Sequence, residues 1–124
     1  MSYRPNSQYH QITGDFVLAS GESCVDDVLL KDGNLTVKSG ATFVCEVKVA
    51  GTVPKVTLEE HTFIYHLHMM NGGEIYFKGE HVLVVELIIE NHVILHIPKS
   101  WNNWKHCFET ISNNDLITIV QDID

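Results

Sequence analysis

The sequence predicts an all-β protein folded as a β-solenoid, with four to five stacked rungs of about 19 residues each. Gly, Pro, Asn and Asp interrupt the chain at short intervals, and the segments between them are rich in Val, Ile, Thr and Phe. Such segments are typical of short strands. The segments also align with one another at a nearly constant interval. Together these observations favour strands that stack rung upon rung.

Four segments of similar pattern follow one another: FVLASGESCVDDVLLKDG from Phe16, LTVKSGATFVCEVKVAG from Leu35, VTLEEHTFIYHLHMMNG from Val56 and IYFKGEHVLVVELIIEN from Ile75. A truncated fifth, VILHI, begins at Val93. The starting positions are 19, 21, 19 and 18 residues apart, and the turn-type sequence at 51–54 accounts for the longest interval. A unit of this length cannot bury its own inner face, whereas stacked units can.

Five apolar columns of this alignment predict the inward-facing side chains. Two columns begin the units: Phe16, Leu35, Val56, Ile75 and Val93, then Leu18, Val37, Leu58, Phe77 and Leu95. Three columns lie in the second halves: Cys24, Phe43, Ile64 and Leu83; Val28, Val47, His68 and Leu87; Leu30, Val49, Met70 and Ile89. The first two columns and the last two columns are each two residues apart, which is the step of a strand with one buried face.

An outer stripe is predicted between the last two core columns. Leu29, Met69 and Ile88 occupy it and are expected to face outward, with Lys48 among them. A partly apolar stripe of this kind tends to be covered by another element or by another subunit. It is therefore a candidate interface.

The C-terminal part of the chain departs from the repeat. Trp101, Trp104 and Phe108 recur at helical spacing, and Ser100 is a suitable N-cap. A terminal rung exposes an unpaired edge and an open core, so we expect a short amphipathic helix to cover it. Residues 116–120 predict a last strand. The Trp side chains also suit an interface.

Length and composition narrow the classes of function. With 124 residues, 44% of them hydrophobic, the chain suits a single domain, 1–124. We divide it into an N-terminal arm (1–14), the rungs (15–97) and a C-terminal cap helix and strand (98–124). The net charge of −8 and the lack of a Lys/Arg cluster argue against a nucleic-acid partner. The chain has no apolar run of membrane-spanning length and no signal-peptide core, so we expect a cytoplasmic protein.

The rung rhythm of residues 16–97 and the phrase LTVKSGATFVCEVKVAG resemble the bactofilins, polymer-forming bacterial cytoskeletal proteins with right-handed β-helical cores. The resemblance implies a non-catalytic scaffold, or a binding or self-association module, that forms a homo-oligomer without a cofactor. The chain lacks the frequent Gly-Asp step of that pattern and adds the Trp-rich segment. The expected contact residues are Leu29, Met69, Ile88, Trp101 and Trp104.

A second family pattern competes with the first. His66, His68 and Glu74 look like the first cupin motif, and VILHIP followed by His106 is similar to the second, although the His-to-Glu spacing is one residue longer. This resemblance implies a cupin-like β-barrel that covers mainly residues 60–120. It also implies a metal-dependent enzyme or small-molecule binding protein, with a divalent transition metal held by these four residues.

The residues themselves leave two interpretations of His66 and His68 open. Two residues is the strand period, so both imidazoles share one face and could bind one ion with a third ligand from a neighbouring strand. In a solenoid, Cys45 would lie beside His66 and could complete such a site. Alternatively, His68 fills a core column as a buried neutral histidine with one hydrogen-bond partner.

Overall fold

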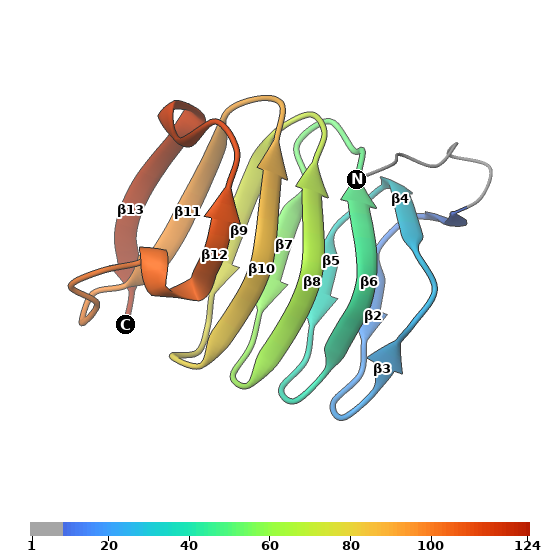
Figure 1. Cartoon of the computed structure of the whole chain (residues 1–124), viewed down its shortest axis with the longest axis horizontal. Coiled ribbons are helices and arrows are strands. Elements are labelled where there is room, and N and C mark those ends of the chain that lie inside the picture. Colours follow the sequence, from blue (N-terminus) through green and yellow to red (C-terminus); the bar gives the residue numbers. More distant parts are fainter. Residues whose placement is uncertain (1–8) are drawn as a thin grey trace.

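The computed structural model describes residues 9–124, which form a parallel β-solenoid of about six turns (Figure 1). The predicted all-β solenoid is therefore confirmed. Every strand pair in the described part of the chain is parallel. The cupin-like barrel is wrong, because cupins are antiparallel double-sheet structures.

Two sheets face each other across the core. Sheet A contains, in spatial order, β1 (His10–Thr13), β4 (Val28–Asp32), β6 (Thr42–Val49), β8 (Thr62–Met69), β10 (Val82–Ile89) and β12 (Phe108–Ile111), and β3 (Ser23–Cys24) also pairs with β6. Sheet B contains β2 (Phe16–Leu18), β5 (Leu35–Val37), β7 (Lys55–Leu58), β9 (Gly73–Phe77), β11 (Val93–Pro98) and β13 (Ile117–Ile123). Each rung passes along sheet B and then returns along sheet A.

The predicted columns hold at the start of the first four units. Phe16, Leu35, Val56 and Ile75 pair in register, as do Leu18, Val37, Leu58 and Phe77. In the fifth unit Leu95, and not Val93, lies beside Ile75. Both Val93 and Leu95 are fully buried, because a shift of two residues keeps a strand on the same face.

A β-bulge in β6 shifts the register of the third unit. The bulge lies between Phe43 and Glu46 and adds one residue to β6 relative to β8. Val47 therefore pairs with Leu67, and not with His68 as predicted. A slip of one residue exchanges the two faces of a strand. Leu67 is consequently in the core, and His68 lies on the outer face of sheet A.

The same slip reverses the predicted orientation of the two methionines. Met69 pairs with Val49 and Ile89 in the core and is 0% exposed, so it does not belong to an outer stripe. Met70 follows the end of β8 and is only partly buried. The predicted interface role of Met69 is therefore wrong.

The turn before β10 is one residue longer than the equivalent turn before it. Seven positions separate Phe77 from Val84 (84 − 77), whereas six separate Leu58 from Ile64 (64 − 58). Val84, and not Leu83, therefore lies beside Ile64.

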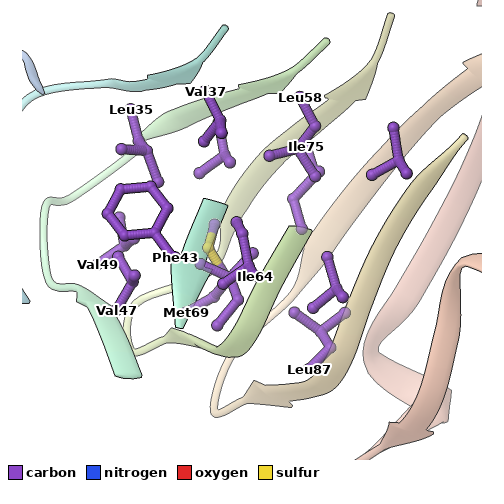
Figure 2. Packing of buried hydrophobic residues seen from close by; sticks show 14 of the residues in the cluster. Leu35, Val37, Phe43, Val47, Val49, Leu58, Ile64, Met69, Ile75 and Leu87 are labelled. Carbon is purple, nitrogen blue, oxygen red and sulfur yellow. The ribbon is translucent and has the colours of Figure 1, made fainter. Parts of the chain in front are cut away.

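The core is continuous along the stack. Figure 2 shows Leu35 and Ile75 of sheet B meeting Val49 and Leu87 of sheet A between the sheets. All four side chains are fully buried. Burying an aliphatic side chain of this size stabilises the fold by roughly 1.5–3 kcal/mol. The rungs are held together by this shared interior and by their strand pairing.

The predicted C-terminal helix does not form in the structure. Instead, a loop ends in a short 3-10 helix, η2 (Lys105–Cys107), and β12 then extends sheet A. A second 3-10 helix, η3 (Asn114–Leu116), leads into β13, which confirms the predicted last strand. The fifth rung is thus complete, and β13 begins a sixth. Between residues 9 and 124, no helix has the length and hydrophobicity required to cross a membrane.

Strand pairing explains why the helical spacing was misleading. Phe108 lies beside Val84 at the edge of sheet A, where its backbone pairs with β10 and its ring points inward. Trp101 packs against Phe77 at 5.7 Å between ring centroids and is 9% exposed. Trp104 contacts Phe108 from outside. The aromatic residues therefore pack against the core from a loop and a strand, and not from the predicted helix.

The predicted N-terminal arm (1–14) lies partly outside the described residues. Residues 10–13 form β1 and pair in parallel with β4, so this part of the arm belongs to sheet A. Tyr9 is buried, and its hydroxyl donates to the Glu46 carboxylate (2.6 Å). The stack therefore begins before residue 15.

The register around the bulge can be tested with two methionines. Met69→Ala is expected to lower the free energy of unfolding by about 2–5 kcal/mol, because it opens a cavity in the core. Met70→Ala is expected to cost less than about 1 kcal/mol, since Met70 is partly exposed. Chemical denaturation followed by circular dichroism measures both. Equal losses, or a larger loss for Met70→Ala, would contradict the register.

Candidate functional site

The four predicted metal ligands lie in three different parts of the structure. His66 and His68 belong to β8 in sheet A, Glu74 to β9 in sheet B, and His106 to η2. A barrel would direct such residues into one interior, whereas the solenoid places His66, His68 and Glu74 on the outer faces of opposite sheets. The four residues do not form one coordination site.

Cys45 does not complete a site with His66. The bulge turns Cys45 inward, where it is 4% exposed, and Glu46 takes the position beside His66. Burial raises the pKa of the Cys45 thiol to about 12, with further contributions from Cys24, Asp26 and Glu46. A thiol in this environment stays protonated near neutral pH and is a poor metal ligand and nucleophile.

His66 takes part in a cross-rung ladder with two carboxylates. It stands in register between Glu46 and Glu86, and its Nε2 lies 3.1 Å from Glu86 Oε1. The Tyr65 ring stacks on the imidazole at 4.0 Å between centroids. The positions 46, 66 and 86 are 20 residues apart in register (66 − 46 and 86 − 66), whereas the predicted alignment places Cys45 and Val85 beside His66. The bulge in β6 and the longer turn before β10 cause this difference, so the repeat alone could not have found the two carboxylates.

His68 sits between two further carboxylates on the same face. Its Nε2 contacts the Glu90 carboxylate, and its Nδ1 lies 3.8 Å from Glu46 Oε2. Glu46 and His68 are 8% and 6% exposed. These two facing atoms have no hydrogen-bond partner within the described residues. His68 is thus a buried histidine as one interpretation required, although it lies outside the core.

Sheet B carries a second carboxylate–imidazole–carboxylate array. His96 Nε2 lies 2.7 Å from Glu74 Oε1, and its Nδ1 lies 2.9 Å from Asp122 Oδ2. Tyr76 stacks on His96 at 4.1 Å and donates its hydroxyl to Glu74 Oε1 (3.1 Å). The His96 hydrogen bond is the main reason why the pKa of Glu74 lies below its ordinary value. Glu74 on β9 therefore bonds His96 on the neighbouring strand β11, and each ring nitrogen of His96 contacts a carboxylate.

These arrays link rungs and show no arrangement for nucleophilic catalysis. The imidazole nitrogens of His66, His68 and His96 face carboxylates on adjacent strands of the same sheet or, for Glu90, directly after one. A charged pair at the surface contributes about 0–1 kcal/mol, and a partly buried one depends strongly on its partners. The arrays therefore fix register along both outer faces.

The predicted outer stripe is not an exposed apolar surface. Leu29 is 5% exposed and Met69 is in the core, which leaves only the partly buried Ile88. In register, Leu29 and Ile88 belong to one row across sheet A, and Lys48 and His68 lie between them in that row. A stripe with two ionisable side chains at its centre is a poor apolar interface.

At each end of the described solenoid, the terminal rung has a neighbouring rung on one side only. Within residues 9–124, β2 and β13 each pair on one side only in sheet B, as do β1 and β12 in sheet A. Several inward-facing apolar side chains are partly exposed at these ends: Ile12, Phe16 and Cys24 at the first rung, and Ile111, Ile117 and Ile119 at the last. Each end therefore combines an open backbone edge with an incompletely covered core.

No protein-family model, curated protein or solved structure matches this chain. The likeness to the bactofilins accordingly extends to a parallel β-solenoid and no further.

The sheet B array predicts a measurable effect of pH. His96→Phe should keep a ring stacked on Tyr76 but raise the pKa of Glu74 towards its ordinary value. A folded-state pKa below the unfolded value contributes stability above the unfolded pKa of about 4.3, and this is lost as pH falls through the folded pKa. The variant should therefore lose less stability on acidification.

Nuclear magnetic resonance titration of the glutamate side-chain carboxyl carbons measures the shift directly. His92→Phe is the matched control. His92 Nε2 bonds the Thr118 hydroxyl (2.6 Å), and His92 is not one of the groups that lower the pKa of Glu74. An unchanged Glu74 titration in His96→Phe would contradict the assigned cause.

Proposed function

We propose that the chain is a non-catalytic scaffold that self-associates end to end, with the last rung of one copy stacked on the first rung of the next. The observation that carries the proposal is the open, parallel strand edge at each end of the described stack. An exposed strand edge is a template for pairing with a further strand. Within the described residues, no strand pairs with the free side of β13.

A second copy is the partner that fits both ends. Ile117 and Ile119 lie in the inward columns beside Val93 and Leu95, so the last rung presents the alternation of every earlier rung. The β2 strand of another copy has the direction and the inward Phe16 that a next parallel neighbour of β13 requires. Stacking would then repeat a contact that the chain already makes internally.

Such a contact is heterologous, because the surface of one end meets a different surface at the other. Heterologous contacts form rings when the rotation closes and open filaments when it does not. The straight stack of rungs in Figure 1 favours the open form. The expected product is a series of species of increasing length.

The negative charge of the chain opposes this association and gives it a characteristic salt dependence. Each copy carries a formal net charge of −8. Salt at about 0.15 M screens such repulsion beyond roughly 8 Å. Assembly through apolar side chains and backbone pairing is therefore expected to increase with salt, whereas assembly through ion pairs would weaken.

Sedimentation velocity over a range of concentrations tests the proposal. The average mass of the wild-type chain should rise with concentration, because each copy has two complementary ends. Ile119→Lys should shift the distribution to the monomer, since a lysine at this position would be buried beneath the next copy. Thr118→Lys is the matched control, with the same added charge on the exposed face of the same strand.

Circular dichroism shows whether each variant has folded. A wild-type chain that stays monomeric at every concentration would overturn the proposal. Equal assembly of Ile119→Lys and the wild-type chain would overturn it as well, because the end would then not be the interface.

A further inference from the structure

One corner of the solenoid departs from the repeat over three consecutive rungs. At the lower edge of the molecule in Figure 1, each sheet B strand turns into the sheet A strand of the same rung. The turn before β10 is one residue longer than its predecessors, and the connection between β11 and β12 is the nine-residue segment 99–107, which contains η2. In repeat proteins, insertions of this kind commonly mark the binding face.

The departure begins with a histidine in place of a glycine. In the first two turns, the third residue after the sheet B strand is Gly21 or Gly40, with φ of +76° and +77°. In the third turn the equivalent residue is His61, with φ of +59°. This left-handed conformation disfavours a side chain, so the fold alone would select glycine here as well. The imidazole is therefore not explained by the turn.

Three potential metal ligands meet at this corner. Glu60, His61 and His81 each offer a donor atom, and these atoms all lie within 4.8 Å of one another. His81 Nδ1 is 3.2 Å from Glu60 Oε1, and the rings of His61 and His81 are stacked with centroids 5.0 Å apart. Donor atoms around a tetrahedral ion are about 3.4 Å apart, given metal–ligand bonds of about 2.1 Å. Both imidazoles are exposed and can adjust by that amount.

The Glu60 carboxylate is held in place by the next turn. It accepts backbone N–H groups from His81 and from Glu80 (3.3 Å). Gly79 permits this approach, because a Cβ there would lie 2.5 Å from the Glu60 Cα. The carboxylate is thus positioned by the backbone of the next turn before any ligand arrives.

We propose that Glu60, His61 and His81 bind a divalent first-row transition metal such as Zn²⁺, Ni²⁺ or Cu²⁺. Two imidazole nitrogens and one carboxylate oxygen suit these ions, whereas Mg²⁺ and Ca²⁺ prefer oxygen donors alone. The net charge of −8 favours the approach of a cation. This site is distinct from the histidines of the predicted cupin-like set.

A pocket of about 550 Å³ adjoins the proposed site and shares His81 with it. The other lining residues include Trp101, Asn102, Asn103 and His106. Three protein ligands leave a position of the metal open, as in zinc sites that bind an exchangeable ligand. Water, or a donor group of a small molecule in the pocket, would complete the coordination.

Titration of the metal-free, tag-free full chain with Zn²⁺, followed by calorimetry and metal analysis, tests the site. We expect one equivalent to bind. His61→Gly and His81→Ala should each weaken binding more than about ten-fold. His61→Gly is the sharper variant, because it restores the residue of the first two turns and should preserve thermal stability. His92→Ala, and His66→Ala combined with His68→Ala, are controls that should bind normally.

Electron paramagnetic resonance of bound Cu²⁺ supplies an independent readout. Two imidazole nitrogens are expected in the wild-type spectrum and one in each ligand variant. The proposal is overturned if none of the three ions binds at millimolar concentration. It is equally overturned if binding survives in His61→Gly and His81→Ala but disappears in the variant that lacks His66 and His68.

Discussion

The structure depends on the parallel pairing of each strand with the equivalent strand one rung away. The two strands of one rung face each other across the core, but a single rung leaves that core open on both sides, so it is stable only against its neighbours. Pairing in register then makes residues about 20 positions apart the ones that touch. The core columns, the Glu46–His66–Glu86 ladder and the contact of Glu60 with His81 all follow from this constraint.

The repeat predicted the solenoid and the start of the first four units, because the pairings of β2, β5, β7 and β9 in sheet B contain no bulge. The second half of the third unit was misplaced for a physical reason. In IYHLHMM, Leu67 and Met69 fill the core in one register, while His68 and Met70 would fill it in the other. The choice is made by the bulge at Val44 and Cys45 in the preceding strand, which has no signature in composition. Local sequence therefore could not decide it.

Strand pairing also determines the conformation of the C-terminal segment and which carboxylates lie beside His66. Trp101, Trp104 and Phe108 have helical spacing, yet an open edge of sheet A offers Phe108 a backbone partner and a covered position for its ring. Backbone pairing and burial of the Phe108 ring therefore outweigh the helical pattern of the local sequence. The partners of His66 depend on the same bulge and on the longer turn before β10, because the aligned units place Cys45 and Val85 beside it and the structure places Glu46 and Glu86 there.

Where the chain departs from the repeat, the residue type is not determined by the packing or turn geometry that the other rungs share. Within a rung, the inward positions must be apolar and the turn after each sheet B strand is best served by glycine, as at Gly21 and Gly40. At the ends the pattern stops without its next neighbour, which leaves Ile117 and Ile119 incompletely covered. At the corner a histidine occupies the glycine position. Stability accounts for neither feature, and both are therefore the parts of the molecule from which a function is best inferred.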